Sequence, residues 1–319
     1  TNRLPEKSAS GLKYSTKFDH ALRFGEATLQ IGPEGTTWEK LHKESTTAGR
    51  TDTYEISLIR TEETGRLEES ESPEMLPGHL TAFMAKLNDA ISASPLKTLT
   101  IYVHGANSSF YRAAAQGAQY RYFTGKQAVV LLFAWPSAEN ILLYETGMKH
   151  NKQSVPDFIR LLRVMATYSN AKRIHIIGYS AGGRLSGDAL GRLGREYELE
   201  NPELIKKKFR FGQLYLTSSD EPLKQFIHNV PSYFHLFEGI TMTVDMEDTV
   251  LGFAQSTDGK IRMGKPPEDT RGLNLTDAQN EWITQAVNSD RLNIINLEIN
   301  KIPGFEFSHG AWYKNPWVS

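Results

Sequence analysis

The feature that most constrains this chain is a serine between a short apolar run and a helical pattern. Residues 173–177, Arg-Ile-His-Ile-Ile, have the length and β-branched content of a buried parallel strand. The pentapeptide Gly178 to Gly182 reads Gly-Tyr-Ser-Ala-Gly, and a helical pattern over 184–195 follows it. A sharp strand-to-helix turn at a serine pushes the hydroxyl above the sheet edge, and the two glycines let backbone pass where a Cβ would clash.

Two interpretations of this turn are open. In one, Ser180 is the N-cap of an ordinary helix in an α/β domain. In the other, the turn is the nucleophile elbow of an α/β-hydrolase and Ser180 is the nucleophile. The strand pattern before the serine favours the elbow, so the sequence predicts a serine hydrolase.

The pattern along the chain predicts an α/β fold with one catalytic core. From Lys97 onward, strand and helix patterns alternate, which is typical of a mostly parallel central sheet with helices on both faces. The expected strands are 99–103, 128–133, 174–177, 211–216, 240–244 and 294–299, and the expected helices are 111–123, 155–168, 184–195 and 276–287. We assign 96–319 to the catalytic core and 1–95 to an N-terminal elaboration packed on the same domain.

The N-terminal elaboration has a less regular pattern. Strands are expected over 22–31 and 53–60, and a helix over about 79–91. Residues 61–77 contain six Glu and two Pro, which predicts an exposed acidic loop.

Composition excludes several classes of function. A formal net charge of −1 over 319 residues gives no pull toward nucleic acid or anionic membranes, and the one basic run, 206–208, is interpreted as a solvated edge after a helix. No apolar stretch reaches the roughly 20 residues of a membrane-spanning helix. Without cysteine there is no disulfide, thiolate metal site or Cys nucleophile. The absence of cysteine fits an exported protein, and the start at Thr1 leaves open the earlier removal of a signal or anchor segment.

A nucleophilic serine requires a base and an acid that orients the base. In α/β-hydrolases these follow the serine in the order Asp or Glu, then His. Of the three later histidines, only His309 follows the last expected strand, whereas His228 and His235 lie between earlier strands. Two carboxylates, Asp248 and Asp220, each follow an expected strand, and Asp248 is also a candidate helix N-cap.

The expected strand 99–103 runs into His104-Gly105-Ala106-Asn107, the second strong feature. A loop at this place supplies one N–H group of an oxyanion hole, and the residue after the nucleophile supplies the other. We therefore expect the Ala106 and Ala181 amides to bind the oxyanion. Supporting roles are expected for His104, Gly105, Asn107 and Tyr179, while the alternative for His-Gly is a plain turn.

Residues 99–309 together resemble the α/β-hydrolase family catalogued as a bacterial domain of unknown function, number 900. The matching features, in order, are His104-Gly105-Ala106-Asn107, Ser109-Phe110, Trp135-Pro136-Ser137, Tyr144, Asp220, Asp248 with Leu251, Arg262-Met263-Gly264, and His309 with Tyr313. The elbow departs from the family's usual His-Ser-Met-Gly, since this chain has Tyr179 and Ala181 around the serine. The resemblance implies the α/β-hydrolase fold and favours Asp248 as the acid.

These features predict a hydrolase that cleaves carboxylic esters, an esterase or lipase, with Ser180, His309 and Asp248 as catalytic residues. No metal or organic cofactor is required, and the expected partner is a small-molecule or lipid ester. The alternatives are thioester or amide hydrolysis, or acyl transfer, by the same residues, and a non-catalytic binding protein of the same fold. A dinucleotide-binding enzyme is disfavoured because no Gly-x-Gly-x-x-Gly follows a strand near the start of the sheet.

Overall fold

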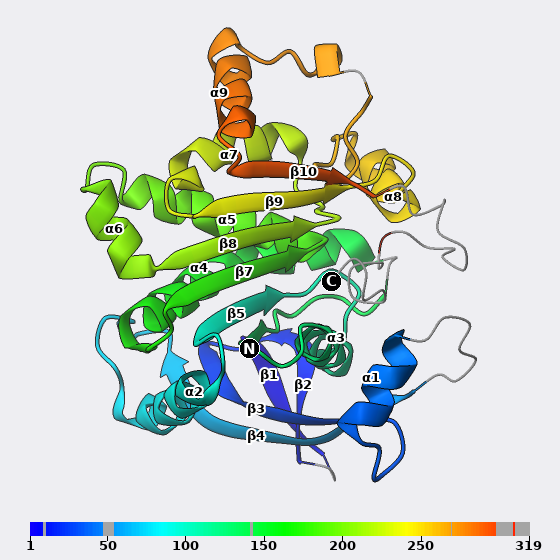
Figure 1. Cartoon of the computed structure of the whole chain (residues 1–319), viewed down its shortest axis with the longest axis vertical. Coiled ribbons are helices and arrows are strands. Elements are labelled where there is room, and N and C mark those ends of the chain that lie inside the picture. Colours follow the sequence, from blue (N-terminus) through cyan, green and yellow to red (C-terminus); the bar gives the residue numbers. More distant parts are fainter. Residues whose placement is uncertain (9–10, 47–53, 141–142, 269, 298–308, 310–319) are drawn as a thin grey trace.

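A six-stranded, all-parallel sheet forms the centre of the molecule, with strand order β10-β9-β8-β7-β5-β6 (Figure 1). The computed structural model describes residues 1–8, 11–46, 54–140, 143–268, 270–297 and 309. The six strands are β5 (Thr98–Val103), β6 (Val129–Phe133), β7 (Arg173–Tyr179), β8 (Phe211–Thr217), β9 (Gly239–Val244) and β10 (Leu292–Asn296). Each corresponds to one of the six runs expected from the sequence, although residues 298 and 299 of the last run lie outside the described residues.

Helices cover both faces of this sheet. They are α3 (Phe110–Phe123), α4 (Tyr144–Tyr168), α5 (Ala181–Glu196), α6 (Pro202–Phe209), α7 (Leu223–Phe234), α8 (Thr249–Asp258) and α9 (Asp277–Asn288), with a short 3₁₀ turn, η3, at Thr270–Leu273. On one face α3 packs over Tyr102, whose hydroxyl bonds to Gln116 Oε1 at 2.8 Å. Helices α4, α5 and α7 pack on the opposite face, which carries the larger core.

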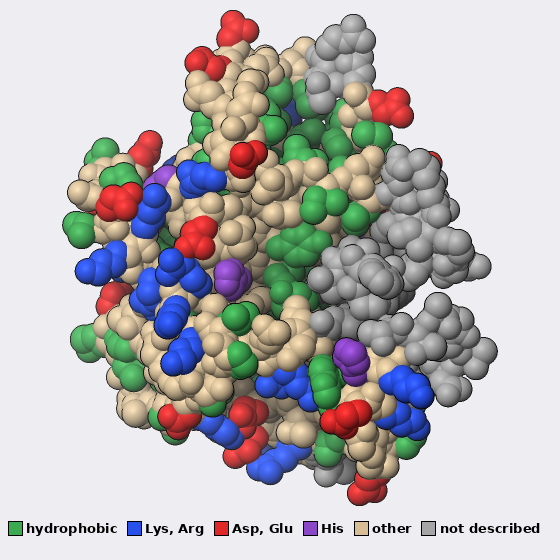
Figure 2. All heavy atoms as spheres, in the orientation of Figure 1, with side chains coloured by type: hydrophobic (Ala, Val, Ile, Leu, Met, Phe, Trp, Pro, Cys, Tyr) green, Lys and Arg blue, Asp and Glu red, His purple; other side chains and the backbone are tan. Residues whose placement is uncertain are grey.

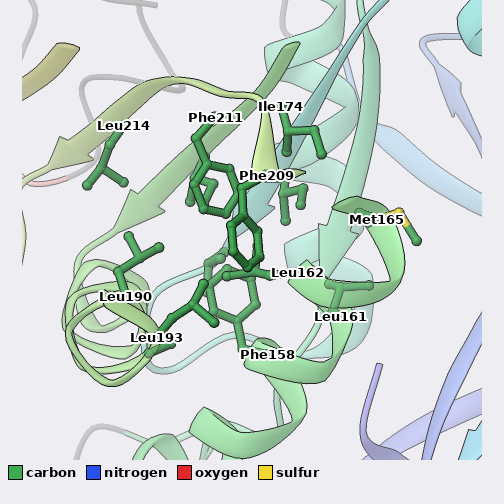
Figure 3. Packing of buried hydrophobic residues seen from close by; sticks show 14 of the residues in the cluster. Phe158, Leu161, Leu162, Met165, Ile174, Leu190, Leu193, Phe209, Phe211 and Leu214 are labelled. Carbon is green, nitrogen blue, oxygen red and sulfur yellow. The ribbon is translucent and has the colours of Figure 1, made fainter. Parts of the chain in front are cut away.

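The main core lies between that second face and its helices (Figure 3). Phe158 and Leu162 from α4 meet Leu193 from α5, with Phe211 at the start of β8 close by (Figure 3). All are nearly inaccessible to solvent. The inner strands β5, β7, β8 and β9 are mostly buried and read as apolar runs, which explains why the sequence predicts them well.

The N-terminal residues form two antiparallel hairpins and two helices. These elements are β1 (Arg3–Ser8), β2 (Gly11–Phe18), β3 (Ala21–Ile31), α1 (Trp38–Thr46), β4 (Ile56–Glu68), the 3₁₀ turn η1 (Gly78–Leu80) and α2 (Thr81–Ala93). Leu22, Leu67 and Phe83 belong to the same buried cluster as the central sheet. The boundary between residues 95 and 96 remains a prediction.

Several sequence-based expectations are wrong in detail. The acidic stretch expected to be a loop from 61 is strand as far as Glu68, because β4 pairs with β3 along its length and Glu63 binds Arg23 at 2.8 Å. Helix α4 begins at Tyr144, eleven residues before the predicted start. The basic run 206–208 forms the last turn of α6 and does not follow a helix. Strands β1 and β2 and helices α1, α6 and α7 were not among the expected elements, whereas α8 begins after the candidate N-cap Asp248.

The topology determines where functional side chains gather. The carboxyl ends of parallel strands meet at one edge of the sheet, and ligands bind outside that edge in open α/β sheets. The loops after β5, β7, β8 and β9 all start there. Among the helices that the structure describes, none is both long enough and apolar enough to span a bilayer.

Candidate active site

Ser180 lies on the sharp turn between β7 and α5 in a strained conformation, with φ 53° and ψ −122°. The glycines around it are required by packing. A Cβ on Gly182 would lie 2.1 Å from the Val103 carbonyl oxygen, and one on Gly178 would lie 2.7 Å from the Gly183 Cα. The sequence-based reason for the two glycines is therefore confirmed. Although Ser180 occupies the N-cap position of α5, its side chain makes no capping hydrogen bond.

The Ser180 hydroxyl faces His309. The distance from Ser180 Oγ to His309 Nε2 is 2.9 Å, and His309 Nδ1 lies 2.7 Å from Asp248 Oδ2. An imidazole protonated at Nδ1 donates to the carboxylate and accepts from the hydroxyl, so this geometry suits the neutral ring. The Asp248 side chain is inaccessible to solvent, and that of His309 is 11% exposed. Three side chains that are far apart in the sequence thus form one hydrogen-bonded chain.

Asp248 comes after β9 and caps α8. Its Oδ1 accepts from the Leu251 N–H at 2.9 Å while its Oδ2 faces His309. The two interpretations of this residue from the sequence, an N-cap and a partner of the histidine, both describe real contacts.

Asp220, the other carboxylate considered, makes different bonds. Its Oδ1 accepts from Arg262 Nε at 2.7 Å and its Oδ2 accepts from the Tyr144 hydroxyl at 2.6 Å. Arg262 is fully buried and also donates to the Ala254 carbonyl in α8. Burial, with the neighbouring Asp220 charge, raises the pKa of Tyr144 above its ordinary value. Asp220 therefore ties α4 and α8 together beside the serine turn.

The loop after β5 packs directly against the serine. A Cβ on Gly105 would lie 3.0 Å from the Ser180 Cβ. Asn107 has a positive φ of 52° and turns the chain, and the following Ser109 caps α3 by accepting from the Arg112 N–H at 3.1 Å. Ala181 is the first residue of α5, where a backbone N–H has no acceptor within its own helix. The positive end of the α5 dipole favours negative charge at this place.

His104 is buried beneath this loop. Its Nδ1 lies 2.7 Å from the Gly105 carbonyl oxygen and its Nε2 lies 3.1 Å from that of Trp135. Burial, with the nearby charge of Arg3, lowers the pKa of His104 to about 3. Both ring nitrogens of His104 thus face backbone carbonyl oxygens and not the Ser180 hydroxyl.

Of the remaining residues considered from the sequence, some contact this site and others lie outside it. The Tyr179 ring contacts the His309 ring with centroids 5.3 Å apart. His228 is exposed and His235 is half-buried, as expected for histidines outside the site. Trp135 is fully buried. Tyr313 lies outside the described residues.

Two residues that the sequence did not indicate contact the site. Asn151, buried in α4, donates to the Ala181 carbonyl at 2.8 Å, and Arg3 in β1 contacts the loops after β5 and β6. Each lies far along the chain from its partner and in no recognisable motif, so only the tertiary structure could reveal it.

No group of His, Asp and Glu side chains suited to a metal ion occurs among the described residues. A cavity of about 1000 Å³ is bounded by β3, α2, α3 and β6. Its described lining does not include Ser180, Asp248 or His309. We take the serine turn as the candidate site because the chemistry-bearing side chains converge there.

A six-stranded parallel sheet with helices around it and a strained serine at its carboxyl edge defines the α/β-hydrolase fold. The predicted fold class is confirmed. A family model described as an alpha/beta hydrolase of unknown function (DUF900) matches residues 80–316. The chain belongs to this family, which is the one that its sequence motifs resemble.

Several solved structures match part of the chain at low sequence identity and low TM-score. A Klebsiella pneumoniae protein provisionally assigned as a dienelactone hydrolase has a TM-score of 0.39 and 11% identity, with 70% of this chain and 85% of that chain covered. A lipase-esterase related protein from Clostridium acetobutylicum has a TM-score of 0.35 and 12% identity, covering 70% and 91%. An acetylxylan esterase has a TM-score of 0.36 and 9% identity, covering 70% and 93%. No curated protein matches the chain.

Proposed function

We propose that this protein hydrolyses carboxylic esters through a covalent acyl-enzyme on Ser180. The observation that carries the proposal is the hydrogen-bonded chain from Ser180 Oγ through His309 to Asp248, with 2.9 Å and 2.7 Å between the paired atoms. Membership of an α/β-hydrolase family supports a hydrolase. The strained turn that presents the serine supports a nucleophilic role for it.

In the proposed reaction, His309 Nε2 takes the hydroxyl proton while Ser180 Oγ attacks the ester carbonyl. The carbonyl oxygen becomes an oxyanion that accepts hydrogen bonds from the Ala181 and Ala106 N–H groups. The intermediate collapses as the imidazolium returns its proton to the departing alcohol. Asp248 holds the ring in the required tautomer and stabilises the imidazolium.

Deacylation repeats these steps with water. His309 removes a proton from a water molecule, the resulting hydroxide attacks the acyl carbonyl, and Ser180 Oγ leaves with that proton. The carboxylic acid is released and the serine is regenerated. No redox partner or cofactor enters this balance.

The test is hydrolysis of p-nitrophenyl esters from acetate to palmitate by the wild type, Ser180→Ala and His309→Ala. Loss of either residue from such a unit lowers kcat by on the order of 10⁶-fold. Two variants serve as matched controls, Ser256→Ala on an exposed serine of α8 and His228→Ala on an exposed histidine of α7, and both should retain activity. The chain-length profile of the wild type distinguishes an esterase from a lipase.

Ester turnover that persists in Ser180→Ala would overturn the assignment. A folded wild type that turns over no ester but reacts with a fluorophosphonate at Ser180 would redirect the proposal to thioesters, amides or acyl transfer. A wild type inert to both would indicate a binding protein of this fold.

A further inference from the structure

Arg3, in the first strand of the chain, lies fully buried beneath the candidate oxyanion loop. Its Nη2 donates to the Ser108 carbonyl at 2.7 Å, and its Nε donates to the Trp135 carbonyl at 2.9 Å. Longer contacts of 3.5 Å reach Ser137 Oγ and the Ser15 carbonyl. One guanidinium therefore joins the loop after β5 to the loop after β6.

These two loops are also joined to each other around Arg3. Ser137 Oγ donates to the Ser108 carbonyl at 2.8 Å and accepts from the Ser108 N–H at 3.2 Å. At the other end of the loop, Trp135 Nε1 donates to the His104 carbonyl at 2.7 Å. The His104 and Trp135 rings are parallel within 3°, with centroids 5.2 Å apart. Residues 104–108 are thus held at both ends, and Ala106 lies between.

Arg3 is a buried cation that donates hydrogen bonds to uncharged oxygens. All of its hydrogen-bond acceptors that the structure describes are uncharged oxygens, and burying a cation in such surroundings costs free energy. Burial lowers the pKa of Arg3 to about 10, so the side chain is still charged at neutral pH. A buried cation bonded to the peptide oxygens of Ser108 and Trp135 polarises those peptide groups and rigidifies the loop that they belong to.

We propose that Arg3 is a positioning residue for the reaction, which orients the Ala106 N–H toward the developing oxyanion by anchoring residues 104–108. This inference rests on the proposed ester hydrolysis. It assigns a supporting role at the active site to a residue of β1, a strand that precedes the family match at 80–316. Misplacement of a catalytic group by about 1 Å costs up to roughly 10²-fold in rate, so Arg3 can affect kcat without touching substrate.

The test compares Arg3→Met, Arg3→Lys and Ser137→Ala with the wild type for kcat, KM and inhibition by a trifluoromethyl ketone. This ketone adds to the serine and places its oxygen as an oxyanion. We expect Arg3→Met to lower kcat by roughly 10- to 100-fold with KM little changed, and to raise the inhibition constant in parallel. Lysine can donate to one or two of the same carbonyls, so Arg3→Lys should restore part of the rate. Ser137→Ala, which removes a smaller side chain, should shift the same parameters in the same direction.

Arg210→Met is the matched control. The Arg210 guanidinium also donates to backbone carbonyls, those of Ala166, Ala171 and Ser169, at 2.9–3.0 Å. It precedes β8, at the end of the sheet opposite Ser180. Its loss should lower thermal stability and leave kcat of the folded protein unchanged. Equal falls in kcat for Arg210→Met and Arg3→Met would overturn the proposal, as would an Arg3→Met protein with wild-type kcat or with a change in KM alone.

Amide hydrogen exchange of residues 104–110 tests the anchoring by Arg3 independently of the proposed ester hydrolysis. If the wild type turns over no ester and reacts with no fluorophosphonate, the proposed function fails by itself. Faster exchange of 104–110 in Arg3→Met and Ser137→Ala, but not in Arg210→Met, would still support anchoring by Arg3. Unchanged exchange in both variants would overturn it.

Discussion

Asp248 uses its two carboxylate oxygens for two different tasks. Oδ1 caps α8 and Oδ2 faces His309, so the helix cap fixes the oxygen that orients the ring. The carboxylate is fully buried, and the cap hydrogen bond restrains its rotamer. The N-cap of α8 is therefore also the hydrogen-bond partner of His309.

Asp248→Asn should abolish most activity while leaving the fold intact. Asparagine is as good an N-cap as aspartate, so α8 should persist. Its amide cannot hold the imidazole tautomer as a carboxylate does, and kcat should fall by roughly 10⁴-fold. Ester hydrolysis and urea unfolding on the same preparation check both parts.

Asp220→Asn is the comparison variant. It should lower stability strongly and kcat only weakly, the opposite of Asp248→Asn. It removes one of the two carboxylates that pair with buried Arg262, the other being Asp258, and breaking a buried pair costs up to about 3–5 kcal/mol. The free energy of unfolding should drop by about that amount, and kcat of the folded protein should fall much less than in Asp248→Asn. If Asp220→Asn loses activity at wild-type stability and Asp248→Asn keeps it, Asp220 is the acid instead.

Glycines in helix α5 allow α7 and the loop before it to pack closely against α5. Its glycines at 187, 191 and 194 face buried groups on α7 and on the loop before it. A Cβ on Gly194 would lie 2.2 Å from the Ser232 carbonyl oxygen, and one on Gly187 would lie 2.3 Å from Glu221 Oε2. Close approach of α7 to α5 fixes the helix whose first residue follows Ser180.

Gly194→Ala should destabilise the protein even though alanine is the better helix former. The added methyl group collides with backbone, and overpacking of this kind costs typically about 1–3 kcal/mol. Gly252→Ala in α8 is the matched control, because the nearest atom to its Cβ would be the end of the Lys265 side chain at 3.6 Å. That change should stabilise the protein by about 0.5–1 kcal/mol.

Chemical unfolding of both variants measures these effects. Opposite signs are expected, and a Gly194→Ala protein as stable as Gly252→Ala would show that α5 can move away from α7 at no cost.

At the scale of the whole molecule, the N-terminal residues and the central sheet share one core, and Arg3 contacts the loops after β5 and β6. Leu22, Phe24 and Leu67 from the β3–β4 hairpin are buried in the same cluster as the sheet. Charged side chains of both signs are interspersed along the left and lower parts of the face in Figure 2. This agrees with the near-zero net charge of the sequence.

Global stability should depend on pH through Glu221. Burial, with the charge of Asp188, raises the pKa of Glu221 well above its usual value of 4.5. Above pH 4.5 the unfolded chain releases this proton while the folded protein retains it, so the folded state binds more protons. This contribution to stability is full below pH 4.5 and is lost as pH rises through the raised pKa of the folded state.

Glu221→Gln, which does not ionise, should remove this contribution. We expect the free energy of unfolding of the variant, relative to the wild type, to increase between pH 5 and pH 8. Urea titrations at several pH values measure the difference, and a difference that does not vary with pH would contradict the assignment.

Local patterns in the sequence account for the fold class, the six strands of the sheet and the serine turn. Buried parallel strands are continuous apolar runs, and the elbow needs glycines within two positions of the serine, so both leave signals over a few residues. The chain order of strands also predicted which histidine could reach the sheet edge. The acidic second part of β4, residues 61–68, was misassigned because Glu is depleted in strands in general. Pairing with β3 and the Arg23–Glu63 contact stabilise this strand.

Only the tertiary structure decided which groups meet across long separations in the chain. Asp248 and Asp220 each follow a strand, and the family resemblance only favours Asp248. In the structure one lies 2.7 Å from His309 and the other is bonded to Arg262. Arg3 lies 105 residues from Ser108, with nothing in the sequence around it to mark the contact. Such contacts depend on how the helices and N-terminal strands pack around the sheet. Packing brings together residues that are distant in the chain, so no local sequence pattern predicts these contacts.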